Sequence, residues 1–229
     1  MKLALPILCA AVIFGASMAA TALLRNAAPE LVAAHRWTEQ AVLKSVLAGL
    51  SLLAIALFNR GGFIAAGFRK ATDVRWRTVV LPALSMGAGS SLLILLAGSR
   101  GLASVVGNYG FPAIVFWIWF YSSLTEEIYT RGWFQSLVEE RSPRHAIPAS
   151  ALLFGAMHLS LFRLIDPVAV VVIVLAATCL GWIAARLRKQ YGSLVTPLVA
   201  HISFNVGGMF GGILYTIGFR IITGRLPVV

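Results

Sequence analysis

Acidic residues are scarce in this chain, which has only 8 Asp and Glu among its 229 residues. Charged residues of both signs make up 12% of the sequence, whereas 59% of it is hydrophobic and the mean hydropathy is +0.86. A soluble domain of this size could not bury so much apolar surface in one core. The composition therefore excludes an ordinary soluble protein and favours one whose solvent is the lipid bilayer.

Cysteine is also nearly absent. Cys9 and Cys179 lie in apolar runs and belong to no CxxC pattern, so we expect two buried, unpaired thiols. The chain also lacks an HExxH pair, the helical signature of many zinc proteases. No low-complexity region, soluble domain or clear internal repeat is visible, which indicates a single membrane domain.

Positive charge is more abundant, because 19 Lys and Arg residues give a net charge of +11. Most of these residues lie between apolar runs, as is typical of loops that contact anionic lipid headgroups. We therefore expect the lipid bilayer as a partner, and no nucleic acid. The high content of Ala, Arg and Gly hints at a GC-rich bacterium, so the predicted location is a bacterial inner membrane.

Seven apolar runs predict an all-α fold, a polytopic transmembrane bundle of about seven spans. The segment 61–68 either lies at the membrane interface or continues the second span. The glycine pairs at 207–208 and 211–212 predict that the last span is kinked or packs closely on a neighbour. The predicted spans cover residues 3–24, 41–58, 78–98, 111–134, 146–162, 167–187 and 194–219.

The first run resembles a signal peptide, but it is longer than the usual apolar region of about 7–15 residues, so we expect an uncleaved first span.

An excess of Lys and Arg marks the cytoplasmic side of a membrane protein. Eleven of these residues fall on the side of the N-terminus and seven on the other, which predicts a cytoplasmic N-terminus and an external C-terminus. The seven are Arg25, Arg36, Lys44, Arg100, Arg163, Arg220 and Arg225.

Glu126 and Glu127 are two of the few acidic residues, and they fall within the fourth apolar run. An ionisable group at membrane depth is costly and usually marks a function. Arg131 follows Glu127 by four residues, so these two side chains share a helical face and can pair. Glu126 is rotated from Glu127 by about 100° and is left free for chemistry. The alternative is that both carboxylates are simply solvated at the headgroups.

Two of the four histidines also lie within apolar runs. His158 is deep in the fifth run, with Phe154 one turn earlier and able to pack against its ring. His201 lies in the last run, and Asn205 is one turn further along the same face. A lone intramembrane histidine is often only a packing residue, but two on separate spans beside a pair of carboxylates favour one functional site.

These residues form three ordered motifs, EEIYTR over 126–131, FGAMH over 154–158 and HISFN over 201–205. They resemble the EExxxR, FxxxH and HxxxN motifs of the CPBP (Abi) family of intramembrane proteases, which includes CAAX prenyl endopeptidases of the Rce1 type. The resemblance implies a conical intramembrane cavity lined by the motif residues. It divides the chain into variable N-terminal helices over 1–110, a catalytic core over 111–219 and a short tail over 220–229.

The resemblance also implies roles for these residues. Glu126 would be the general base that activates water, with His158 assisting, while His201 and Asn205 would stabilise the oxyanion of the tetrahedral intermediate. Glu127, Arg131 and Phe154 would support them. We expect no metal cofactor, since asparagine is a poor zinc ligand. The alternative is a zinc site made by Glu126, His158 and His201.

Other functions stay open at this point. A proton- or ion-coupled transporter also uses buried Glu and His, and it is favoured by inverted repeats that this chain does not show. A non-catalytic scaffold of the same family is a further alternative. For a protease, the expected substrate is a membrane-associated protein or peptide. A CAAX-type tail, a bacteriocin or pheromone precursor and a C-terminal sorting signal all fit, and the oligomeric state is not predicted.

Overall fold

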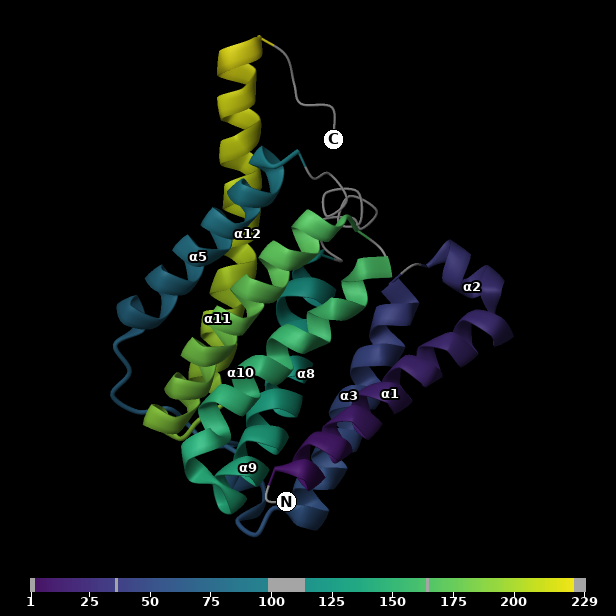
Figure 1. The fold of residues 1–229 in the computed structure, drawn as a ribbon, viewed down its shortest axis with the longest axis vertical. Coiled ribbons are helices and arrows are strands. Elements are labelled where there is room, and N and C mark those ends of the chain that lie inside the picture. Colours follow the sequence, from purple (N-terminus) through teal and green to yellow (C-terminus); the bar gives the residue numbers. More distant parts are fainter. Residues whose placement is uncertain (1–2, 36, 99–113, 164, 225–229) are drawn as a thin grey trace.

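The computed structural model describes residues 3–35, 37–98, 114–163 and 165–224. These residues form helices and no strand, which confirms the predicted all-α class (Figure 1). Residues 111–113 of the fourth predicted span and 225–229 of the predicted tail lie outside the described residues. So do Lys2, Arg36, Arg100 and Arg225, which entered the comparison of charges.

Five helices of the described chain are long and apolar enough to cross a bilayer. They correspond to the first, second, third, sixth and seventh predicted spans, and their ends differ from the predicted ends by four residues at most. They are α1 (Ala4–Ala27), α3 (Trp37–Phe58), α5 (Trp76–Leu96), α11 (Pro167–Tyr191) and α12 (Val195–Thr223).

The fourth and fifth predicted spans are helical, but neither is one uninterrupted α-helix. The fourth is a continuous run that ends at Arg141 rather than 134, because Pro143 forces the preceding Ser142 out of helical geometry (φ −155°, ψ 75°). The α-helix of the fifth ends at Met157, and a 3-10 turn continues the helical segment to Arg163. The fourth comprises the π-helical η1 (Ile114–Ser122), α8 (Ser123–Glu127), the π-helical η2 (Ile128–Gln135) and α9 (Ser136–Arg141); the fifth comprises α10 (Ala146–Met157) and η4 (His158–Arg163).

The bundle surrounds the run from α8 to α9, which we call the central helix (residues 123–141). Nearly all its residues up to Val138 are buried, including large apolar side chains such as Tyr129 and Trp133. The Tyr129 hydroxyl donates to the Ala10 carbonyl of α1 at 2.8 Å, and Gln135 donates to the Ala185 carbonyl of α11 at 3.0 Å. These bonds fix the rotation of the central helix, and so the direction of its polar side chains.

Close packing explains the glycines of the last span. A Cβ at Gly207 would stand 2.0 Å from the Leu84 carbonyl oxygen, and one at Gly211 would stand 2.4 Å from that of Ala88. Gly87 on the facing helix has the same relation to Phe204. The helices α5 and α12 therefore touch backbone to backbone, as small residues allow in membrane proteins, and the predicted close packing is confirmed.

The short segments occupy the ends of the bundle. The helix α2 (Pro29–Ala34) joins α1 to α3, and α4 (Gly62–Ala65) is a single turn in the 61–68 segment. Because α3 ends at Phe58, this segment does not continue the second span. Its Gly67 carbonyl instead accepts a hydrogen bond from Leu194, at the start of α12, at 2.9 Å.

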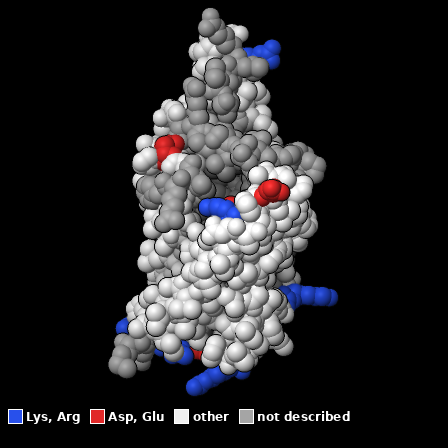
Figure 2. Space-filling model, turned by 90° about the vertical axis from the view of Figure 1, so that its right-hand side faces the viewer, with Lys and Arg blue, Asp and Glu red and all other residues white. Residues whose placement is uncertain are grey.

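The surface of the bundle is largely uncharged. Figure 2 shows one face as mostly uncharged surface, with Lys and Arg gathered mainly at its lower end. The apolar side chains of α1 and α11 that face outward, such as Leu23 and Leu175, fit contact with lipid. Both cysteines are free, as expected, but the expectation that they are buried is wrong. Cys9 is only half-buried and Cys179 is exposed.

Candidate active site

Glu127 lies at the centre of the candidate site and is fully buried. Its Oε1 accepts a hydrogen bond from Arg131 Nη1 at 3.1 Å, one helical turn on, and a second from His201 Nδ1 at 2.9 Å. The α8 and α12 helices are thus joined by a carboxylate. Since Nδ1 of His201 donates to Glu127, its Nε2 is the ring nitrogen that is left for other partners.

Glu126 faces a different side of the central helix, as the rotation between neighbouring residues predicts. It is not free, however: its Oε1 accepts from Lys44 Nζ of α3 and from Ser122 Oγ at 2.8 Å. Its Oε2 stands 3.7 Å from His201 Nε2, which is too long for a hydrogen bond. No described residue donates a hydrogen bond to Oε2, so this oxygen can receive one from water.

Phe154 packs against both histidines. Its buried ring meets the ring of His158 at 5.1 Å and that of His201 at 5.2 Å, both edge to face. The Arg131 guanidinium lies over the same ring, 4.4 Å from its centroid, which is a cation–π contact. The predicted contact of Phe154 with His158 is therefore present, and the same ring also contacts two residues of the other motifs.

His158 stands at the end of α10, where the helix tightens into η4. Its Nδ1 donates to the Phe154 carbonyl at 2.8 Å, and no described residue forms a hydrogen bond with its Nε2. Asn205 is one turn after His201 and its Nδ2 donates to Ser123 Oγ at 3.0 Å. The described structure thus joins Glu127 and His201 by a hydrogen bond and places Oε2 of Glu126 at 3.7 Å from the same imidazole ring. His158 contacts the Phe154 ring, which also contacts His201. Asn205 is hydrogen-bonded to Ser123 of the central helix.

Residues 108–207 match a family model described as type II CAAX prenyl endopeptidase, Rce1-like. The match spans 100 of the 229 residues, and within that segment the chain is similar to the Rce1-like family. The match contains all three motifs, and it confirms the resemblance that those motifs predicted. No curated protein and no solved structure matches the chain. The chain is therefore a helical membrane protein with one segment that is similar to Rce1-like endopeptidases.

Lys44 was missed by the sequence reasoning and lies outside the Rce1-like segment. The charge comparison counted it with external loop residues, which is wrong, because it lies inside α3 and its side chain is only 11% exposed. The signal was available: Lys44 is the one charged residue of the predicted span 41–58. Ser122 and Ser123 carry no such signal, since serine is common in membrane helices.

Formal charges balance in the candidate active site, where the carboxylates of Glu126 and Glu127 are paired with Lys44 and Arg131. Among the described residues, no three His, Cys, Asp or Glu side chains are grouped so that they could hold a metal ion. Lys44 pairs with Oε1 of Glu126 and leaves Oε2 without a donor among the described residues. The metal-free site stays a prediction.

A cavity of about 530 Å³ lies at the end of the bundle where α9 and α11 end. None of the seven predicted site residues lines it. The conical cavity that the family implies around the motif residues therefore stays a prediction.

Proposed function

We propose that this chain is an intramembrane endopeptidase that uses Glu126 as a general base to hydrolyse a peptide bond in a membrane-associated protein or peptide. The observation that carries the proposal is the pair of adjacent carboxylates that meet one histidine inside the bundle. Oε1 of Glu126 is held by Lys44 and Ser122, whereas Oε2 is left for a water molecule. Hydrogen bonds to one oxygen fix the direction of the other, as a positioned base requires.

The reaction begins when water attacks the carbonyl carbon and Oε2 of Glu126 accepts the proton. His158 assists, because its Nδ1 is occupied by the Phe154 carbonyl and its Nε2 is then the acceptor of a neutral ring. The proton then passes to the leaving amine as the carbon–nitrogen bond breaks. This step needs no group beyond water and the side chains of the chain itself.

His201 and Asn205 serve as donors to the developing oxyanion. His201 uses Nε2, since Nδ1 donates to Glu127, and it donates from Nε2 when the ring carries both protons. The Glu127 carboxylate stabilises that imidazolium and fixes the plane of the ring, as a buried carboxylate does in other histidine-dependent hydrolases. Arg131 in turn orients Glu127 from the next turn of the helix.

The substrate class is proposed from the matched family, whose description names CAAX prenyl endopeptidases. The substrates that fit are a CAAX-type tail, a bacteriocin or pheromone precursor and a C-terminal sorting signal. All three place the cleaved bond next to the membrane, where the site lies. We propose the metal-free mechanism for each of them, and a bacterial inner membrane as its location.

The proposal is tested in cells that lack the native gene and express either the wild-type chain or Glu126→Gln. Mass spectrometry of protein and peptide termini in the membrane fraction is expected to reveal cleaved ends that depend on the wild type. Glu140→Gln is the matched control, because Glu140 is an exposed carboxylate of the same helical run. Identical termini from wild type and Glu126→Gln would contradict the proposal. Proton flux in liposomes that is lost in Glu126→Gln, with unchanged termini, would favour the transporter.

A further inference from the structure

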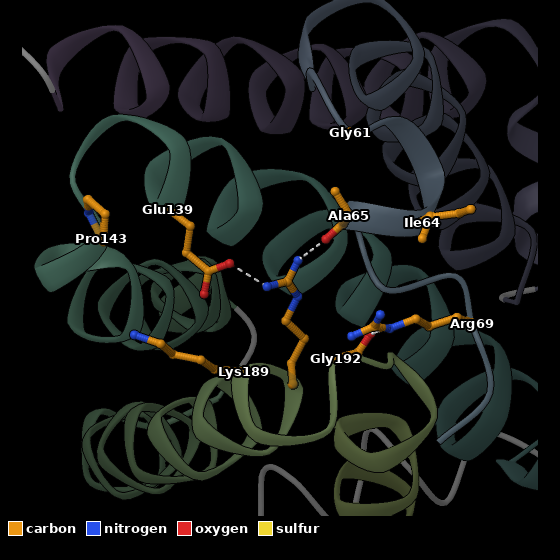
Figure 3. A pocket seen from close by; sticks show the side chains of 9 residues that line it. Gly61, Ile64, Ala65, Arg69, Glu139, Pro143, Lys189 and Gly192 are labelled. Atoms are coloured by element: carbon orange, nitrogen blue, oxygen red, sulfur yellow. Dashed lines mark hydrogen bonds and ion pairs between the residues drawn. The ribbon is translucent and has the colours of Figure 1, made fainter. Parts of the chain in front are cut away.

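The cavity at the end of the bundle, which we call the basal pocket, is formed by side chains unrelated to the candidate active site. It lies between the segment that follows α3, the end of α9 and the end of α11 (Figure 3). Three of its lining residues are cations and one is an acid, so the lining carries a formal charge of +2 (three minus one). They are Arg69, Arg188, Lys189 and Glu139.

Arg188 lines the basal pocket and is 5% exposed. Its Nη1 donates to the Glu139 carboxylate and its Nη2 to the Ala65 carbonyl (Figure 3). Its Nε has no hydrogen-bond partner among the described residues. A buried donor without a partner is unfavourable. Glu139 neutralises the charge of Arg188, so the net positive charge of the lining comes from Arg69 and Lys189.

Arg69 and Lys189 lie on opposite sides of the pocket (Figure 3). Both are exposed, and neither forms an ion pair with any described residue. Arg69 is nevertheless held in one position, because its Nε donates to the Gly192 carbonyl at 2.7 Å. A Cβ at Gly192 would stand 1.6 Å from Arg69 Nη2, and φ there is +62°, so only glycine permits this contact. The guanidinium of Arg69 is therefore positioned at the pocket, and the exposed Lys189 lies opposite it.

The chemistry of this lining suits a phosphate group. A guanidinium presents paired N–H donors that match two phosphate oxygens, and an ammonium opposite it adds a point charge. The nearby segment also exposes apolar side chains, with Phe63 at 43%, Ile64 at 67% and Phe68 at 39%. A soluble phosphate would leave these apolar side chains uncovered, whereas the acyl chains of a lipid would cover them.

We propose that the basal pocket binds the phosphate of an anionic phospholipid headgroup. Basic pockets between membrane helices bind such headgroups by this combination of charge and apolar contact. The pocket is separate from the candidate active site, so this inference does not depend on the proposed peptidase activity. Its failure would leave that activity intact.

The test compares binding of phosphatidylglycerol to three forms of the purified full-length chain in neutral detergent, with phosphatidylcholine as the neutral lipid. The pocket variant is Arg69→Gln/Lys189→Gln, which spares the buried Arg188. The control is Arg75→Gln/Arg77→Gln, which removes two exposed charges that do not line the pocket. We expect native mass spectrometry and thermal shift to show saturable binding of phosphatidylglycerol to wild type and control, and binding at least tenfold weaker to the pocket variant.

Three outcomes would contradict the proposal or redirect it. Equal loss of binding in both variants would mean that the lipid is attracted by surface charge in general. Phosphatidylglycerol that binds no better than phosphatidylcholine would mean that the pocket does not recognise the headgroup. Either result overturns the proposal. Inorganic phosphate is tested in the same way as the third outcome. If phosphate alone raises the melting temperature saturably, and only the pocket variant loses this effect, the pocket binds free phosphate. The lipid assignment is then overturned. The variant Arg69→Lys/Lys189→Arg keeps both charges and is expected to retain binding.

Discussion

Replacement of Lys44 by methionine is expected to destabilise the protein although Lys44 lies outside the family motifs. Methionine has nearly the length of lysine and suits an apolar helix, so the substitution removes the ammonium group without opening a large cavity. The Lys44 and Glu126 side chains are 11% and 8% exposed, so their ion pair is buried. Loss of one partner leaves the other carboxylate charge at membrane depth with little solvent to replace it.

The magnitude follows from what remains around Glu126. Removal of one partner from a buried ion pair costs about 3–5 kcal/mol in soluble proteins. Ser122 still donates to Oε1 of Glu126 after the substitution, and His201 Nε2 still faces Oε2 at 3.7 Å. We therefore expect the low end of that range, about 3 kcal/mol, which is roughly a hundredfold change in the unfolding equilibrium.

The assay is equilibrium unfolding in mixed micelles of SDS and a mild detergent, followed by tryptophan fluorescence, since Trp133 is buried in the core. The variants Lys44→Met, Glu126→Gln and the double variant form a thermodynamic cycle with the wild type. The double variant is expected to recover most of the lost stability, because it leaves no unpaired charge. Arg25→Met is the matched control, because it breaks an ion pair that α3 forms with α1 at the surface. Arg25 of this Arg25–Glu39 pair is 63% exposed, so its loss is expected to have little effect.

Two results would refute this reasoning. One is a Lys44→Met variant as stable as the wild type. The other is a double variant whose loss equals the sum of the two single losses, since additive effects would mean that Lys44 and Glu126 do not interact.

Three other predictions test separate parts of the structure. Glu127→Gln, which weakens the hold on His201 Nδ1, is expected to lower kcat by about 100-fold with little change in KM, because small misplacements of a catalytic group have effects of that size; an unchanged kcat would contradict the proposed role. Gly207→Ala is expected to lower the free energy of unfolding by about 1–3 kcal/mol, because the added methyl group overpacks against α5. Gly212→Ala is the control and is expected to be neutral, since a Cβ there meets nothing within 4 Å. Equal effects of the two substitutions would contradict the close packing of α12 on α5. Cleavage is expected to persist after dialysis against strong chelators, and a stoichiometric zinc ion whose removal abolishes cleavage would refute the metal-free mechanism.

Much of the fold could be predicted because apolar length is a direct signal. Each of the five long apolar helices lies within four residues of a predicted span. The fourth and fifth spans were harder, since their ends depend on features that hydropathy does not report. Pro143 ends one run, and at His158 the other changes from an α-helix to a 3-10 turn. Burial of the two cysteines was predicted wrongly because an apolar neighbourhood in sequence does not distinguish a lipid-facing side from a core-facing one.

Part of the candidate site could also be predicted. The pairing of Glu127 with Arg131 follows from helical spacing, and the contact of Phe154 with His158 follows from the same rule. Contacts between helices do not follow from spacing, which is why the hydrogen bond from His201 to Glu127 and the ion pair of Lys44 with Glu126 emerged only in three dimensions. Lys44 in particular showed that the carboxylate predicted to be free is held by a residue 82 positions away.

Cleavage of a defined substrate in proteoliposomes tests the central claim most directly. The wild type, Glu126→Ala and His158→Ala are purified, checked for equal helicity and insertion, and incubated with a substrate identified from the comparison of membrane termini. The account predicts that the wild type cleaves the substrate and that both variants lose cleavage while they remain folded. Full activity in both variants would contradict the assignment of Glu126 and His158 as the groups that activate water.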